Sequence, residues 1–119
     1  MTSEQNSAAT YNFKCNQNET FQRTLTYKDS TGSAIDLTNF TAALQVRRDF
    51  DTAPVISLTE SAGITLGGVA GTIAIVIAAT ATAALDANTH YYDLVITSPA
   101  GVKTRILEGK FDIVRGVTR

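Results

Sequence analysis

The feature that most constrains this chain is a two-residue alternation of apolar and polar side chains, which recurs in short stretches along most of its length. Phe13 and Cys15 alternate with polar residues in "YNFKC", and Tyr92, Leu94 and Ile96 share one strand face in "YYDLVIT". Residues two apart share one face of a β-strand, so this period predicts strands with one buried face. Turn sequences such as "DSTG", "GGVAG" and "SPAG" separate the stretches. Short strands with regular turns predict an all-β sandwich.

The last two strands are expected to form a hairpin around "SPAG". The return strand, 102–114, changes phase at Ile106 and Leu107, where two apolar residues are adjacent. One extra residue in a strand produces such a change, so we expect a β-bulge there. The segment "ATATAALDAN" is the one helical candidate, because alanine favours helix. It predicts one short helix near residues 80–86, with Thr80 as a candidate N-cap.

The 119 residues fit a single domain, which we place at residues 10–119. Residues 1–9 are polar and without a period, and we expect a flexible N-terminal arm. The N-terminus lacks the basic and apolar regions of a secretory signal, and no apolar run is long enough to span a bilayer. A net charge of −1 gives no reason to expect nucleic acid or an anionic membrane as a partner. We therefore expect a soluble protein made in the cytoplasm.

Residues that could carry chemistry are few. The only histidine, His90, is expected at a surface or edge position, and nothing marks a serine as its nucleophilic partner. Glu108 and Asp112 lie roughly 13 Å apart on one strand, which is too far for glycoside hydrolysis. Asp49 and Asp51 are interpreted as a solvated turn. The single cysteine, Cys15, cannot form an intrachain disulfide and is expected to be a small buried hydrophobe. We expect no catalytic residue, no cofactor site and no metal site.

Two groups of surface residues leave alternatives open. The basic residues could form a patch, although we favour charges that keep strand edges from pairing; they are Arg47, Arg48, Lys103, Arg105 and Lys110. The aromatic residues Tyr11, Phe50, Tyr91 and Tyr92 could form a platform on which sugars stack. Tyr92 is in phase with Leu94 and is assigned to the core instead.

An ordered series of segments resembles a known family. The segments are "LTYKDSTGSAIDLTNFTAALQVRRD", "ITLGGVAGTIAIVIAATATAAL" and "YYDLVITSPAGVKTRILEGKFDIVRGVTR". Together they are similar to the small Ig-like β-sandwich of tailed-phage virion proteins, such as the N-terminal domain of upper baseplate proteins, from Tyr11 to Arg119. The resemblance implies an antiparallel Ig-like sandwich and a non-enzymatic virion protein. It implies a tail, neck or baseplate adaptor that docks on other virion proteins in multiple copies.

Two other functions stay open, the second of them from the tyrosines and the acidic residues near turns. One is a capsid decoration protein of the same fold, and the other is a carbohydrate-binding β-sandwich. The expected location is the virion, and the expected partners are other virion proteins, with a possible homo-oligomer within the particle. Nucleic acid and membrane are not among the expected partners.

Overall fold

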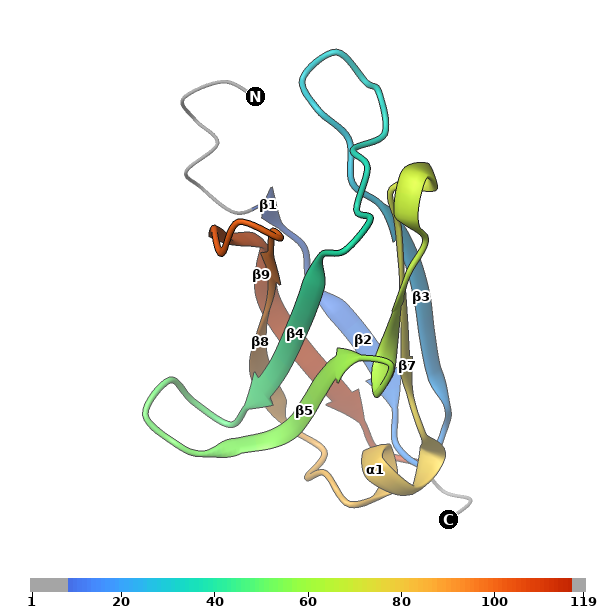
Figure 1. Cartoon of the computed structure of the whole chain (residues 1–119). Coiled ribbons are helices and arrows are strands. Elements are labelled where there is room, and N and C mark those ends of the chain that lie inside the picture. Colours follow the sequence, from blue (N-terminus) through green and yellow to red (C-terminus); the bar gives the residue numbers. More distant parts are fainter. Residues whose placement is uncertain (1–8, 117–119) are drawn as a thin grey trace.

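The computed structural model describes residues 9–116 and consists mainly of β-strands (Figure 1). In chain order the elements are β1 (Ala9–Thr10), β2 (Phe13–Asn16), β3 (Phe21–Thr26), β4 (Thr41–Arg47), β5 (Pro54–Glu60), β6 (Gly63–Leu66), the 3-10 turn η2 (Gly68–Ala70), β7 (Thr72–Ile77), the helix α1 (Ala79–Ala83), β8 (Thr89–Thr97) and β9 (Lys103–Val114). No helix among these residues is both long and apolar enough to cross a membrane.

The strands form one sheet that curls over to make two layers (Figure 1). One layer runs β9-β8-β4-β5, with β1 and β2 both added to β9 in parallel. The other layer runs β6-β7-β3. A short parallel pairing of β5 with β6, at Thr59 and Glu60, makes the corner between the layers. The remaining pairs are antiparallel.

This strand order is that of an immunoglobulin-type sandwich. The strands β9, β8, β4 and β5 follow one another as strands G, F, C and C′ do, and β3, β7 and β6 follow one another as B, E and D do. The prediction of an all-β, antiparallel Ig-like sandwich with one short helix is therefore confirmed.

The core lies between the layers and is filled by the alternating apolar residues. Leu44 and Val46 of β4, Leu94 of β8 and Ile73 and Ile75 of β7 are at most 2% exposed. Each of these side chains contributes about 1.5–3 kcal/mol by leaving water. Cys15 is buried as expected, and burial raises the pKa of its thiol.

An aromatic cluster joins the two layers near β2. The rings of Phe13 and Tyr92 are 5.0 Å apart, and those of Phe21 and Phe111 are also 5.0 Å apart. Phe13 and Phe21, which lie in different layers, approach to 5.2 Å edge to face. Such pairs contribute about 0.5–1.5 kcal/mol beyond the area that they bury. The guanidinium of Arg23 covers this cluster, 4.4 Å from the centre of the Phe21 ring.

A close approach of two backbones fixes the segment around Tyr11 against β9. The buried Tyr92 hydroxyl donates a hydrogen bond of 2.5 Å to the carbonyl of Tyr11. Gly109 is the residue paired with Tyr92, and a Cβ atom at Gly109 would lie 2.2 Å from the same Tyr11 oxygen. Only glycine allows the chain to pass here without moving the backbone.

The helix α1 is held by a side chain other than the one expected. Its N-cap is Ala78, which provides no side-chain hydrogen bond, so the predicted capping role of Thr80 is wrong. Thr82 is fully buried, and its hydroxyl donates to the Glu19 carbonyl at 2.9 Å and accepts from the Glu19 amide at 3.2 Å. A helix of one to two turns needs such packing to persist.

The predicted bulge in β9 is confirmed. Leu94 pairs with Leu107 and Val95 pairs with Arg105, so Ile106 is the extra residue. The predicted arm, residues 1–9, falls outside the described residues except for Ala9, which pairs with Leu107.

Replacing Gly109 by alanine is expected to destabilise the fold by about 2–3 kcal/mol, because the new Cβ meets backbone atoms that cannot rotate away. Urea unfolding measures the loss. Hydrogen exchange should also be faster at the Tyr11 amide, which donates a hydrogen bond to the Glu108 carbonyl at 2.9 Å. Gly101→Ala is the control: its site is open and far from Tyr11, so its strain leaves the Tyr11 amide protected. Equal exchange at Tyr11 in both variants would contradict the close-approach argument.

Replacing Tyr92 by phenylalanine is expected to remove part of the alkaline instability. Burial, followed by the charges of Tyr11 and Glu108, raises the pKa of Tyr92 above its ordinary value. The phenol's contribution is complete below the unfolded-state pKa of about 10 and is lost as the pH rises toward the folded-state pKa. The free energy of unfolding, measured with urea from about pH 9 to 12, should therefore fall less steeply with pH for Tyr92→Phe. At pH 7 the variant should lose about 1 kcal/mol, because the Tyr11 carbonyl loses its donor. An unchanged alkaline slope would contradict this assignment.

Candidate functional site: the outer face of β4, β8 and β9

Most of the candidate residues are outward side chains of three adjacent strands. Arg47 of β4, Tyr91 of β8 and Lys110 of β9 are cross-strand neighbours in one row. The next row holds Gln45, Asp93 and Glu108. We call these six residues, together with Arg105 and Phe50, the outer face.

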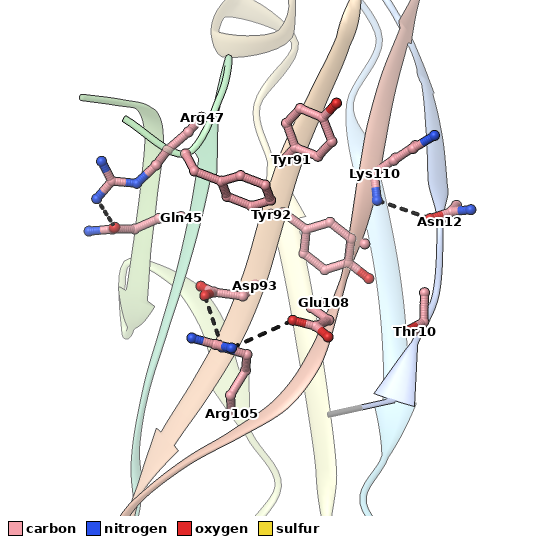
Figure 2. A pocket seen from close by; sticks show the side chains of 12 residues that line it. Thr10, Asn12, Gln45, Arg47, Tyr91, Tyr92, Asp93, Arg105, Glu108 and Lys110 are labelled. Carbon is pink, nitrogen blue, oxygen red and sulfur yellow. Dashed lines mark hydrogen bonds and ion pairs between the residues drawn. The ribbon is translucent and has the colours of Figure 1, made fainter. Parts of the chain in front are cut away.

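The outer face is hollowed into an open concavity of about 870 Å³ (Figure 2). Its lining also includes Thr10, the last residue of β1, and Asn12, in the segment joining β1 and β2. Asn12 is held there because its Oδ1 accepts a hydrogen bond of 3.0 Å from the Lys110 amide. The concavity is therefore bounded by β4 and its loop on one side and by Thr10 and Asn12 on the other.

An aromatic pair stands at one end of this hollow. Phe50, from the loop between β4 and β5, is 79% exposed, and its ring centre lies 5.0 Å from that of Tyr91 with the planes 31° apart. The loop is held by Asp49, whose Oδ1 accepts from the Asp51 amide at 2.9 Å, and by a hydrogen bond from Arg47 to the Thr52 carbonyl. Asp49 and Asp51 thus form a turn, as expected, and that turn presents Phe50.

The charges of the outer face are only partly paired with one another. Asp93 and Glu108 are directly opposite on adjacent strands, and Arg105 bridges them at 3.2 Å and 3.6 Å (Figure 2). Like charges in this position repel, so Arg105 relieves an unfavourable contact. Arg47 binds the Gln45 side chain at 2.8 Å. Lys110 makes no ion pair with any residue between 9 and 116.

The basic residues divide between two roles. Lys103 and Arg105 lie on the part of β9 that precedes its pairing with β1, which begins at Leu107. Within the described residues this part of β9 has an open edge. These two charges therefore lie where we favoured charges that keep strand edges from pairing. Arg47 and Lys110 lie inside the sheet and belong to the outer face. Arg48 lies elsewhere, in an ion pair of 2.7 Å with Asp86.

The predicted aromatic platform is only partly assembled. Phe50 and Tyr91 come together, whereas Tyr92 is 4% exposed and faces the core, as assigned from its phase. Tyr11 packs on Phe13 with ring centres 5.1 Å apart and does not line the concavity.

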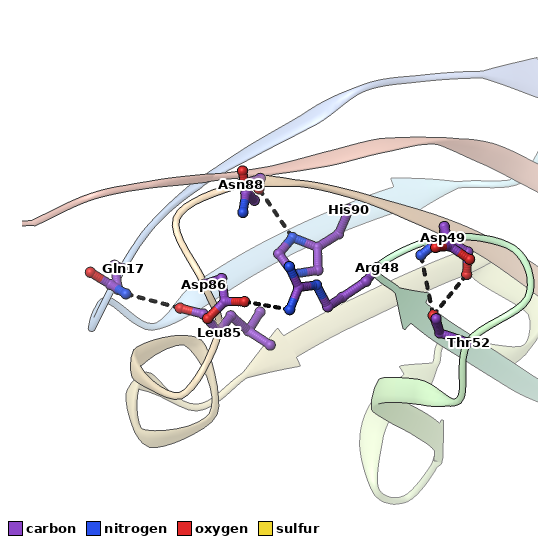
Figure 3. Close-up of polar contacts among 8 residues, drawn as sticks. All are labelled: Gln17, Arg48, Asp49, Thr52, Leu85, Asp86, Asn88 and His90. Atoms are coloured by element: carbon purple, nitrogen blue, oxygen red, sulfur yellow. Dashed lines mark hydrogen bonds and ion pairs between the residues drawn. The ribbon is translucent and has the colours of Figure 1, made fainter.

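His90 is buried, which corrects the expectation of a surface or edge position. Its ring is 1% exposed, and Nδ1 donates a hydrogen bond of 3.0 Å to the Asn88 carbonyl (Figure 3). The reason is its phase, since His90 is two residues before Tyr92 on the inward face of β8. The alternation already contained this signal.

Acidic groups show no metal centre in the part of the chain that the structure describes. No three His, Cys, Asp or Glu side chains are grouped closely enough to hold an ion there. Glu108 and Asp112 both lie on β9, four residues apart on the same face, as the sequence indicated.

Comparison with known proteins gives similarity to solved structures alone, because no family model and no curated protein matches the chain. One similar structure comes from work on cell-adhesive interactions of sodium channel beta subunits: 12% identity, TM-score 0.49, covering 88% of this chain and 92% of that one. Another is the extracellular domain of the voltage-gated sodium channel beta4 subunit: 11% identity, TM-score 0.47, covering 91% and 93%. A third is extracellular domains 3–5 of Drosophila OTK: 15% identity, TM-score 0.40, covering 88% and 32%.

These findings overturn the resemblance to tailed-phage proteins. The three structures named above are described as cell-adhesive or extracellular domains and none of them is a phage protein, so the predicted virion function and virion location are wrong, and the predicted virion partners have no support. The physical reason lies in the segments that carried the resemblance. Alternating strands, a glycine turn and a short helix before β8 are requirements of the Ig-like sandwich itself, so they identify the fold and no particular family.

Replacing Arg105 by methionine is expected to destabilise the fold by about 0.5–1 kcal/mol at low salt, because Asp93 and Glu108 then face each other uncompensated. The loss should shrink at about 1 M salt, where the Debye length is about 3 Å. Urea unfolding at two salt concentrations measures it. Lys103→Met is the matched control, since Lys103 makes no ion pair with the described residues. A loss that does not depend on salt would contradict the electrostatic explanation.

Proposed function

We propose that this chain is a non-enzymatic protein-binding module whose binding surface is the outer face of β4, β8 and β9. The observation that carries the proposal is the exposed Phe50 ring stacked beside Tyr91 in a hollow bordered by charges of both signs. Aromatic residues and arginine are enriched where proteins bind one another, and they supply much of the binding energy.

The construction of the face supports this assignment. Arg47, Tyr91 and Asp93 belong to central strands whose opposite sides pack into the core, so the face is rigid. A rigid surface loses little conformational entropy on association. Phe50 is the exception, since it comes from a loop, but that loop is closed by hydrogen bonds to Asp49 and Arg47.

The chemistry of the face favours binding over catalysis. Its ionisable side chains are exposed or half-buried, and Asp93 and Glu108 are already engaged by Arg105. The histidine of the chain lies on the other side of β8, with one ring nitrogen committed to a backbone carbonyl. A nucleophile on the outer face would therefore have no histidine beside it to act as its base.

Site-specific photo-crosslinking tests the proposal. A benzoylphenylalanine at position 50 is expected to form covalent adducts of defined mass with protein in the cells that make this chain. The same probe at Val69 is the control, because Val69 is 75% exposed but belongs to η2, away from the outer face. Adduct formation at position 50 should fall at least several-fold when Tyr91 is replaced by alanine. Equal yields at positions 50 and 69, or no protein adducts at either, would contradict the proposal.

A further inference from the structure

We infer that the outer face binds a second copy of this chain, docked so that β9 of one copy runs antiparallel to β9 of the other. The inference rests on the proposed function and names its partner. It depends on the order of charges along β9 and on the spacing that the bulge at Ile106 gives them.

Four consecutive outward side chains of β9, from Arg105 to Asp112, alternate in sign, and the outward residue before them is Lys103. In order they are Arg105, Glu108, Lys110 and Asp112, paired with Val95, Asp93, Tyr91 and Thr89 of β8. Their partners are every second residue of β8, so the four charges are evenly spaced at about 6.8 Å. The extra residue at Ile106 produces this even spacing, because it brings Arg105 onto the same face as Glu108.

This order is self-complementary when the strand is reversed. A two-fold axis that crosses β9 between Glu108 and Lys110 sets each Lys110 against Glu108 of the other copy. The same axis sets each Arg105 against Asp112 of the other copy. Each of these four charges therefore meets its opposite, and interfaces with a two-fold axis require this kind of self-complementarity.

The neighbouring strands fit the same arrangement. Because the axis exchanges the two central rows, the Tyr91 hydroxyl faces the Asp93 carboxylate of the second copy. Arg47 faces the amide of Gln45 in the same way. The stacked Phe50 and Tyr91 rings then lie inside the contact, where leaving water stabilises the complex.

The opposite orientation is excluded by charge. Turning the second copy about an axis parallel to the strands places β9 over β4, so Lys110 lies over Arg47 of the other copy. Two cations then face each other in the middle of the contact, which opposes association. In the monomer Lys110 has no ion pair among the described residues, while Asp93 and Glu108 share Arg105. In the antiparallel arrangement, Lys110 faces the Glu108 carboxylate of the other copy.

Charge-reversal variants mixed together provide the test. In a dimer of Lys110→Glu, positions 108 and 110 of both copies carry carboxylates, so like charges face each other. In a dimer of Glu108→Lys, both positions carry ammonium groups, and like charges again face each other. Analytical ultracentrifugation of the full chain should show that each variant self-associates at least tenfold more weakly than the wild type. A 1:1 mixture should form a heterodimer within about threefold of the wild-type affinity, because each variant then meets its opposite. The variant carrying both changes should regain self-association.

Two controls separate this result from loss of folding. Circular dichroism and urea unfolding check that each variant keeps the sandwich. Lys103→Glu changes the net charge as Lys110→Glu does, but Lys103 lies on β9 beyond the four alternating charges. Self-association of Lys103→Glu is expected to stay within twofold of the wild type.

The outcomes distinguish this inference from the proposed function. Wild-type chains that stay monomeric at millimolar concentration, while the position-50 probe forms adducts with a different protein, would overturn the second copy as partner and leave the function standing. Monomers without any protein adducts would overturn both. If neither charge reversal weakens self-association and the mixture forms no preferred heterodimer, the antiparallel arrangement is overturned.

Discussion

The fold depends on a set of aromatic contacts that tie its two layers together without a covalent bond. Antibody domains join the corresponding layers by a disulfide between strands B and F. This chain has one cysteine and uses rings instead, with Phe13 and Tyr92 from one layer meeting Phe21 from the other. The Tyr92 hydroxyl also holds the Tyr11 carbonyl, so the same cluster attaches the start of the described chain to β9. Both layers and both parallel additions to β9 therefore share one point of attachment.

Fixing the inward residues of β8 also fixes its outward ones. Because Tyr92 is anchored in the core, Tyr91 and Asp93 must point to the other side, beside Arg47 and Glu108. The aromatic cluster thus determines the geometry of the outer face, although no residue of that face belongs to the cluster. A rigid core is what allows a shallow surface to present charges in a defined order.

Much of the fold follows from the sequence, because burial of one strand face is a local pattern. The alternation at Leu94 and Ile96 located β8, and two adjacent apolar residues located the bulge at Ile106. The same pattern placed Tyr92 in the core and would have placed His90 there as well. The short helix was found from its alanines, but Thr82, which anchors it, was not, since its partner Glu19 is 63 residues away.

The candidate site was less accessible to sequence reasoning, because it is assembled from distant segments. Phe50 and Tyr91 were both noticed, yet nothing local indicates that the loop carrying Phe50 folds over β8. The bridge from Arg105 to Asp93 depends on cross-strand register, which is set by pairings across the whole sheet. The phage resemblance failed for the opposite reason, since its segments reflect requirements that unrelated Ig-like sandwiches share.

Because of the bulge, the number of residues in β9 determines which of its side chains are exposed to water. Upstream of Ile106 the even-numbered residues of β9 are the inward ones, and downstream the odd-numbered residues are. Removing a single residue at this point would turn Arg105 and Lys103 toward the interior and bring Thr104 out in their place. A one-codon deletion here would therefore exchange the inward and outward side chains over half of the strand.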